Sequence, residues 1–147
     1  MRVNGKPCLD YIIEHANKMA KIDEIVVVDG QFNDIREYCS RRHPKVKVVN
    51  QPSLDGPRDA ISIGMNALKD VNKPVVVWLG DAIILDETMK LGQDFLLCKD
   101  VRNHSDWCMW DGDEFYNKPS HKVKDGVALV GLYSFENGEQ ASLAFSS

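Results

Sequence analysis

The segment KVKVVNQPSLDGPRDAISIGMNALKD, residues 45–70, indicates how this chain folds. An apolar run ends at Val49 and breaks at Asn50-Gln51-Pro52, and a loop with Gly56 and a second proline follows. After the loop, apolar residues recur at helical spacing, which predicts a helix from about 57 to 70. A buried strand followed by an amphipathic helix is the repeating unit of α/β proteins.

The same alternation continues on both sides of this segment. Apolar spacing predicts a helix from about 7 to 21, with Pro7 in its first turn. DEIVVVDG predicts a buried strand over residues 24–28, FNDIREYCSRR a helix, and KPVVVWLGDAII a further strand over residues 74–79. This order predicts an α/β, Rossmann-like domain in which a mostly parallel sheet has helices on both faces.

The second half of the chain has a different pattern. Residues 94–101 and GVALVGLYSF predict strands, and WCMWDGDEFY predicts a hairpin around Asp111-Gly112. These strands are expected to extend the sheet in antiparallel fashion. The 147 residues contain no repeat or linker and predict a single domain, 1–147.

Composition and charge restrict the possible partners. The net charge is -4 and no basic face is clustered, which argues against nucleic acid and anionic membranes as partners. No apolar run approaches the ~20 residues of a membrane span, and the first residues do not resemble a signal peptide. The four cysteines are scattered without a C-x-x-C pair, so we expect reduced, mostly buried thiols and a cytoplasmic location. His15, His43 and His121 are predicted to be surface residues.

Two candidate ligand sites follow predicted strands, since ligands of open α/β sheets bind beyond the carboxyl ends of the strands. Asp81, directly after Gly80, is either an Mg²⁺ ligand or a cap of the next segment. Gln51 offers the donors and acceptor that a nucleobase edge requires, and Gly56 leaves room for a flat ring. Spacing alone favours an ordinary connection here, with Asp55 as the helix N-cap.

Six segments in order resemble the sugar-1-phosphate nucleotidyltransferases, typified by glucose-1-phosphate thymidylyltransferases. They are NGKPCLDYII, DEIVVV, QPSLDGPRDAI, VVVWLGDAI, NKP and VALVGLYSF, and they span about residues 3 to 138. The resemblance implies that a nucleoside monophosphate passes from a nucleoside triphosphate to a sugar 1-phosphate, with release of pyrophosphate. Its implied roles are base binding at Gln51 and Gly56, Mg²⁺ binding at Asp81, and sugar-phosphate binding at Asn117, Lys118 and Gly131.

The chain departs from the family pattern at three places. Asn117 stands where the family usually has Glu, which leaves the sugar undefined. The family's Gly-rich phosphate loop and catalytic lysine fall before the position that matches Met1, and its second metal-binding Asp falls beyond Ser147. We therefore expect an apparently truncated domain with little transferase activity. Two alternatives stay open: a cytidylyltransferase for a small phospho-alcohol such as phosphocholine, and a non-catalytic regulatory or assembly module.

The resemblance also implies an absent central strand. In such sheets the first strand lies between the strands assigned here to residues 24–28 and 74–79. Those strands would then have unpaired edges, and unpaired buried backbone groups cost ~1 to 3 kcal/mol each. Direct closure of the sheet or association of copies would satisfy them, and we expect a homo-oligomer.

Overall fold

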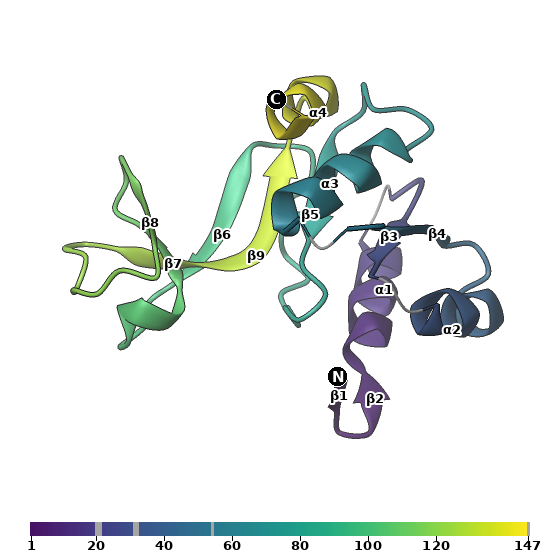
Figure 1. The fold of residues 1–147 in the computed structure, drawn as a ribbon, viewed down its shortest axis with the longest axis horizontal. Helices are drawn as coiled ribbons and strands as arrows, with labels where there is room; N and C mark the ends of the chain where they lie inside the picture. Colours follow the sequence, from purple (N-terminus) through teal and green to yellow (C-terminus); the bar gives the residue numbers. More distant parts are fainter. Residues whose placement is uncertain (20–21, 31–32, 54, 147) are drawn as a thin grey trace.

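The computed structural model describes residues 1–19, 22–30, 33–53 and 55–146 (Figure 1). Its helices are α1 (Cys8–Lys18), α2 (Asp34–Arg42), α3 (Pro57–Asn66) and α4 (Gly138–Ser146). Its strands are β1 (Arg2–Val3), β2 (Lys6–Pro7), β3 (Val26–Asp29), β4 (Lys47–Asn50), β5 (Val75–Trp78), β6 (Phe95–Lys99), β7 (Cys108–Trp110), β8 (Phe115–Asn117) and β9 (Val127–Phe135). A 3₁₀ turn, η1, covers His104–Asp106.

The predicted strand–helix alternation of the first half is present. β3 and β4 form a parallel pair in which Val26 lies opposite Lys47 and Asp29 opposite Asn50. Helix α3 packs on β3 at Gly64, where an added Cβ would lie 3.1 Å from Cγ2 of Val28. A larger residue than glycine would therefore require the Val28 side chain or the helix to shift by a few tenths of an ångström.

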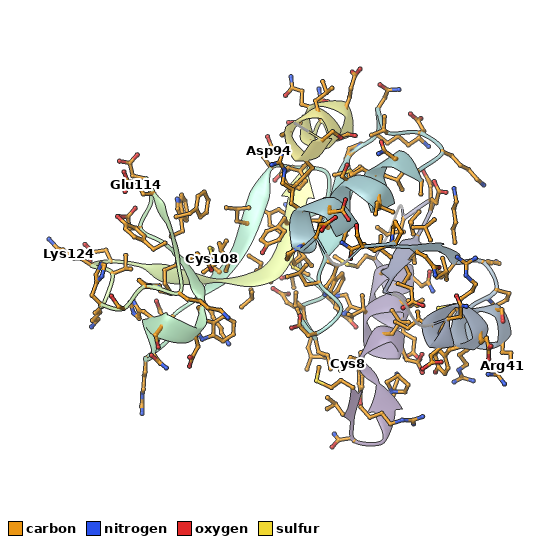
Figure 2. All side chains as sticks on the ribbon, viewed as in Figure 1. Cys8, Arg41, Asp94, Cys108, Glu114 and Lys124 are labelled. Atoms are coloured by element: carbon orange, nitrogen blue, oxygen red, sulfur yellow. The ribbon has the colours of Figure 1, made fainter. Side chains whose placement is uncertain are left out.

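An antiparallel sheet built around β9 makes up the second half. β5, β6 and β7 each pair with β9, and β8 pairs with β7. The predicted hairpin is confirmed: a side-chain oxygen of Asp111 accepts hydrogen bonds from the N–H groups of Asp113 and Glu114 and so closes the turn. Figure 2 shows this hairpin, which carries Cys108 and Glu114, at the opposite end of the view from Arg41.

The prediction of a mostly parallel sheet is wrong. β3 and β4 form the parallel pair of the described strands, whereas β5 pairs antiparallel with β9 at four successive positions. β9 is nine residues long and mostly apolar, and it pairs with three other strands. Its long-range pairing with β5 places β5 in the antiparallel sheet. The fold is therefore mixed α/β with parallel and antiparallel sheets, and the Rossmann-like arrangement stays a prediction.

The helix bounds differ from the prediction at their ends. Helix α1 starts after Pro7 and ends at Lys18; the last two residues of the predicted span, 20 and 21, lie outside the described residues. Helix α3 starts at Pro57 as predicted but ends at Asn66 rather than near residue 70. Such differences are usual because helix ends fray.

Buried side chains are concentrated in two places. Met109, Val123 and Ala128 form a cluster where β7 meets β9, and Met109 and Ala128 are fully buried. On α1, Ile12 and Ile13 are also buried. By contrast, the valines of β3 and β5 are only half-buried, although they form the most apolar runs of the chain.

All four cysteines are free, as predicted. Cys8 and Cys39 are buried, and Cys98 and Cys108 are half-buried. Burial raises the pKa of Cys98 and Cys108. In the part of the chain that the structure describes, no helix is long and apolar enough to cross a membrane.

Candidate functional site

Gln51 holds the loop between β4 and α3 together. Its backbone N–H donates to the carbonyl of Asp29 (2.7 Å), which continues the β3–β4 pairing by one residue. Its side chain is 8% exposed, and its Nε2 donates to the carbonyl of Gly56 (3.2 Å) and to Oδ2 of Asp59 (2.8 Å). Both partners are acceptors, so the amide nitrogen must face them. The side-chain N–H donors of Gln51 therefore already have partners in the loop and in α3.

Gly56 presents open backbone next to Gln51. Its φ of 94° and ψ of -178° belong to a region that essentially only glycine adopts. The residue is exposed, and among the described residues, its two chain neighbours apart, none has an atom within 4 Å of the place where a Cβ would stand. The backbone at Gly56 is therefore not covered at this point, and the stacking of a flat ring on it stays a prediction.

The expected N-cap role of Asp55 is wrong. Gly56 occupies the N-cap position of α3 and makes no side-chain cap bond. Asp55 instead accepts a hydrogen bond from Ser53 Oγ at 2.6 Å. The positive φ of Gly56 turns the chain into the helix one residue later than a side-chain cap at Asp55 would.

Gly80 and Asp81 follow β5 in a tight turn. The N–H of Ala82 donates to the carbonyl of Leu79 (3.1 Å), and Nε1 of Trp78 donates to the carbonyl of Ala82 (2.7 Å). Both Gly80 and Asp81 are exposed. The turn therefore holds the Asp81 carboxylate at the surface, where a ligand can reach it.

Whether Asp81 can bind Mg²⁺ depends on the donor groups around it. Among the described residues, no three His, Cys, Asp or Glu side chains converge as a metal site. Mg²⁺ is commonly held by one or two carboxylates together with substrate phosphates. A single exposed carboxylate fits a metal ion that arrives with a triphosphate, and it does not form a complete site without one.

The three residues predicted to bind a sugar phosphate lie on two strands that β7 separates: Cys108 of β7 pairs with Asn117, and Met109 of β7 pairs with Ala128 of β9, three residues before Gly131. Gly131 is buried, has a φ of +83°, and an added Cβ would lie 3.0 to 3.1 Å from the Leu79 side chain. Packing of β9 against the end of β5 accounts for this glycine, and it places Gly131 close to the turn of Asp81. Asn117 and Lys118 are exposed at the end of β8. The β7–β8 hairpin lies at the far end of the molecule from α1 and α2 (Figure 1).

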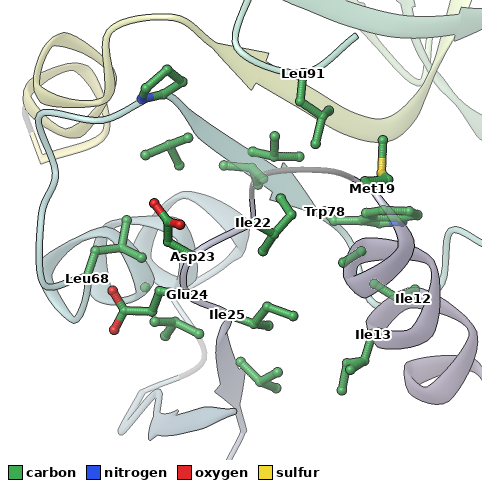
Figure 3. A pocket seen from close by; sticks show the side chains of 18 of the residues that line it. Ile12, Ile13, Met19, Ile22, Asp23, Glu24, Ile25, Leu68, Trp78 and Leu91 are labelled. Carbon is green, nitrogen blue, oxygen red and sulfur yellow. The ribbon is translucent and has the colours of Figure 1, made fainter. Parts of the chain in front are cut away.

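A large cavity of about 1350 Å³ lies between α1, β3, α3 and β5 (Figure 3). Its walls are the valines of β3 and β5 and apolar residues of the two helices. Pro57, next to Gly56, and Gly80, next to Asp81, both line it. One chain neighbour of Gly56 and one of Asp81 therefore border the same space, but Gln51, Gly56 and Asp81 themselves are not among its described lining residues, and neither are Asn117 and Lys118.

A buried polar cluster between α1 and α2 was not predicted. Asp10 is 3% exposed. Its carboxylate accepts hydrogen bonds from the Tyr38 hydroxyl (2.8 and 2.7 Å) and lies 2.7 Å from Nε2 of His43. Burial raises the pKa of Asp10, but the hydrogen bonds from His43 and Tyr38 outweigh it and hold the pKa below its ordinary value. Asp10 lies three residues before the buried Ile13, so helical spacing places it on the buried side of α1. This spacing is the feature of the sequence from which a buried carboxylate could have been predicted.

Two of the three histidines predicted at the surface are not there. His15 is 7% exposed; its ring meets the edge of Trp78 at 5.5 Å, and its Nε2 lies 3.1 Å from the carbonyl of Asp86. The side chain of His43 is 11% exposed against Asp10. His121 is exposed, as predicted. Partners far away in the sequence bury the first two.

Asp29 ends β3 with an incomplete set of hydrogen bonds. It is 5% exposed; its Oδ1 accepts from the N–H of Gly30 (2.8 Å), and its buried Oδ2 has no hydrogen-bond partner among the residues that the structure describes. Burial, and then the charges of Asp29 and Asp10, raise the pKa of the Cys39 thiol. The effect of Asp29 that the structure shows is therefore on the buried thiol of Cys39, whose pKa its charge raises.

Comparison of the chain with models of protein families, and with curated proteins, finds no match.

Proposed function

We propose that this chain is a nucleotide-binding domain of the sugar-1-phosphate nucleotidyltransferase type, in which the loop of Gln51 and Gly56 receives the base. The observation that carries the proposal is the open backbone at Gly56, held in place by the side chain of Gln51. In this proposal the side-chain oxygen of Gln51 is the hydrogen-bond acceptor for a base stacked there. Any second hydrogen bond to the base would come from the loop backbone.

The position of the turn at Asp81 supports the triphosphate half of the proposal. Gly80 borders the same cavity as the start of α3, so a nucleotide on Gly56 could extend its phosphates towards Asp81. In the proposed reaction a phosphate oxygen of a sugar 1-phosphate attacks the α-phosphorus, and the bond to pyrophosphate breaks. The residues of this chain would position the base, and Asp81 would bind the Mg²⁺ that accompanies the phosphates.

Titration with nucleotides, followed by amide NMR, tests the proposal. UTP, TTP, CTP and ATP are each added with MgCl₂, and tripolyphosphate serves as a ligand without a base. We expect nucleotides to shift the amide signals of Gln51 and Gly56, and tripolyphosphate to shift those of Gly80 and Asp81 alone. Equal shifts at Gly56 with tripolyphosphate, or nucleotide shifts confined to residues 104–114, would contradict base binding in this loop.

A matched pair of variants separates the role of Asp81 from a general effect of charge. Asp81→Asn keeps the size of the side chain and removes its charge, and Asp125→Asn does the same at an exposed position between β8 and β9. We expect Asp81→Asn to weaken Mg²⁺-dependent triphosphate binding at least tenfold and Asp125→Asn to leave it unchanged. Equal effects of the two would remove Asp81 from the site.

A further inference from the structure

A second, smaller cavity of about 420 Å³ lies where β6 ends and β9 begins. The two strands are antiparallel, and the pairing of Lys99 with Ala128 places the end of β6 beside the start of β9. Figure 2 shows Lys124, which lies between residues that line this cavity, at the opposite end of the view from Arg41. Among the residues that the structure describes, the two cavities have no lining residue in common.

His104 is a buried polar residue that lines the smaller cavity. It is 7% exposed, and its Nδ1 accepts a hydrogen bond from the backbone N–H of Val123 at 3.0 Å. A ring nitrogen that accepts a hydrogen bond carries no proton, so the proton of the neutral ring is on Nε2. In this tautomer Nε2 is a hydrogen-bond donor and not a metal ligand.

Nε2 of His104 is open to a ligand. The hydrogen bonds of the described residues leave it without a partner. In the same part of the chain, the enclosed side-chain atoms that lack a partner belong to Asp29 and Ser134, so Nε2 is not sealed inside the core. The cavity that His104 lines is therefore where an acceptor reaches this donor.

Charged groups of both signs line the cavity without pairing. Asp100 follows β6, and Lys122 and Asp125 precede β9; all three residues are exposed. Within the described ranges, the ion pairs join other residues, even though a lysine and two aspartates border one small space. These three charges are therefore available to a ligand.

The mixture of groups indicates the class of ligand. Two carboxylates and one ammonium group give the described lining an excess of one negative charge, which disfavours a polyanion such as a triphosphate. A simple cation would leave the N–H of His104 and the ammonium group of Lys122 without an acceptor. A small molecule with both a carboxylate and an ammonium group satisfies both kinds of group, and the cavity lies within the ~300 to 1,000 Å³ of small-molecule sites.

We propose that this cavity binds a small zwitterion of the α-amino acid class. The carboxylate of the ligand accepts a hydrogen bond from Nε2 of His104 and pairs with Lys122. Its ammonium group pairs with Asp100 and Asp125. The site does not depend on the proposed nucleotide site, because Gln51, Gly56 and Asp81 are not among the lining residues that the structure describes.

NMR titration of the full chain with each of the standard L-amino acids tests the proposal. In the free chain, the nitrogen signals of the His104 ring should show the proton on Nε2. We expect at least one amino acid to shift the Nε2 signal and the amide signals of Val123 and Gly126, with saturation. The signals of Gln51 and Gly56, which report base binding, should not change, so the two proposals can fail separately.

Derivatives of the amino acid that binds best show whether both of its charges are recognised. The N-acetyl derivative lacks the ammonium group, and the α-carboxamide lacks the carboxylate. Each should bind at least tenfold more weakly than the parent amino acid, because each leaves one set of lining groups unpaired. Glucose, which offers hydroxyl groups without charge, and inorganic phosphate should also bind more weakly.

Two variants test the residues themselves. His104→Asn places a side-chain oxygen near the position of Nδ1, so it keeps an acceptor for Val123 but loses the donor at Nε2. It should weaken binding at least tenfold while thermal unfolding stays close to that of the unaltered chain. Lys122→Met should weaken binding by a similar factor, and Lys124→Met, at an exposed neighbour outside the described lining, should leave binding unchanged.

Four results would overturn the proposal. They are unchanged signals of His104 and Val123 with every amino acid, a free ring with its proton on Nδ1, tighter binding of glucose or phosphate than of any amino acid, and equal effects of Lys122→Met and Lys124→Met. The last comparison involves exposed side chains only, so it holds even if His104→Asn fails to fold.

Discussion

Nε2 of His43 lies 2.7 Å from Oδ1 of Asp10, and this contact joins the C-terminal end of α2 to the first turn of α1. The Tyr38 hydroxyl donates to the same carboxylate. The buried carboxylate of Asp10 is stabilised in its charged form because it has two hydrogen-bond donors. Loss of this carboxylate would leave Tyr38 and His43 without their acceptor. The contact between α1 and α2 at this point therefore depends on the Asp10 carboxylate.

Substitution of Asp10 should change stability at acidic pH. The folded pKa of Asp10 lies below its unfolded value of about 3.9, so its contribution is present above that pH and is lost as the pH falls through the folded pKa. Asp10→Asn should lower the free energy of unfolding at pH 7 by about 1 to 3 kcal/mol and flatten its decrease between about pH 5 and 2. Urea unfolding over this pH range measures both effects.

Asp100→Asn is the matched control for Asp10→Asn, because Asp100 is exposed and follows β6 at the surface. It should leave both the stability at pH 7 and its pH dependence almost unchanged. Equal flattening in both variants would show that general charge, not the cluster of Asp10, causes the loss of stability in acid.

Gly131→Ala should destabilise the chain more than Gly112→Ala. Both glycines have positive φ, +83° and +104°, so alanine strains both positions. At Gly131 the new Cβ would also press on Leu79, whereas at Gly112 no described residue other than its chain neighbours has an atom within 4 Å of the new Cβ. We expect Gly131→Ala to cost about 1 to 3 kcal/mol more, the range for overpacking in a core. Thermal unfolding of the two variants measures the difference, and equal losses would contradict the close packing of β9 on β5.

Met109→Ala should identify the buried cluster of the antiparallel sheet. Met109 is fully buried with Val123 and Ala128, and truncation of such a side chain costs about 2 to 5 kcal/mol. Leu85→Ala is the control, because Leu85 is 77% exposed and should change stability by less than about 0.5 kcal/mol. Chemical denaturation compares them. A loss below 1 kcal/mol for Met109→Ala would mean that the cluster contributes little to stability.

Tyr116 should resist ionisation in alkali. Its hydroxyl donates to Asp111 at 2.9 Å, and this bond, with burial and the nearby negative charges, raises the pKa of Tyr116 to about 12. A raised folded pKa gives stability that is present below about pH 10 and is lost as the pH rises through about 12. NMR of ring-labelled tyrosine measures the titration, and Asp111→Asn should move the pKa of Tyr116 towards 10. Glu114→Gln, at the more distant partner of the hydroxyl, should have the smaller effect.

Local elements were predictable from the sequence. The apolar run of residues 24–28, the helix that begins at Pro57 and the Asp111-Gly112 hairpin depend on the periodicity and turn preferences of neighbouring residues, and all three are present.

Only the tertiary structure decided which strands pair and which side chains meet. The pairing of β5 with β9 joins segments far apart in the sequence, and their apolar patterns suit a parallel or an antiparallel partner equally. Likewise, nothing near Gln51 in the sequence shows that its amide is held by Gly56 and Asp59, or that His43 faces Asp10. Helices and turns are formed by hydrogen bonds between residues that are close in the sequence. Burial and strand pairing depend instead on which segments of the whole chain pack together most favourably.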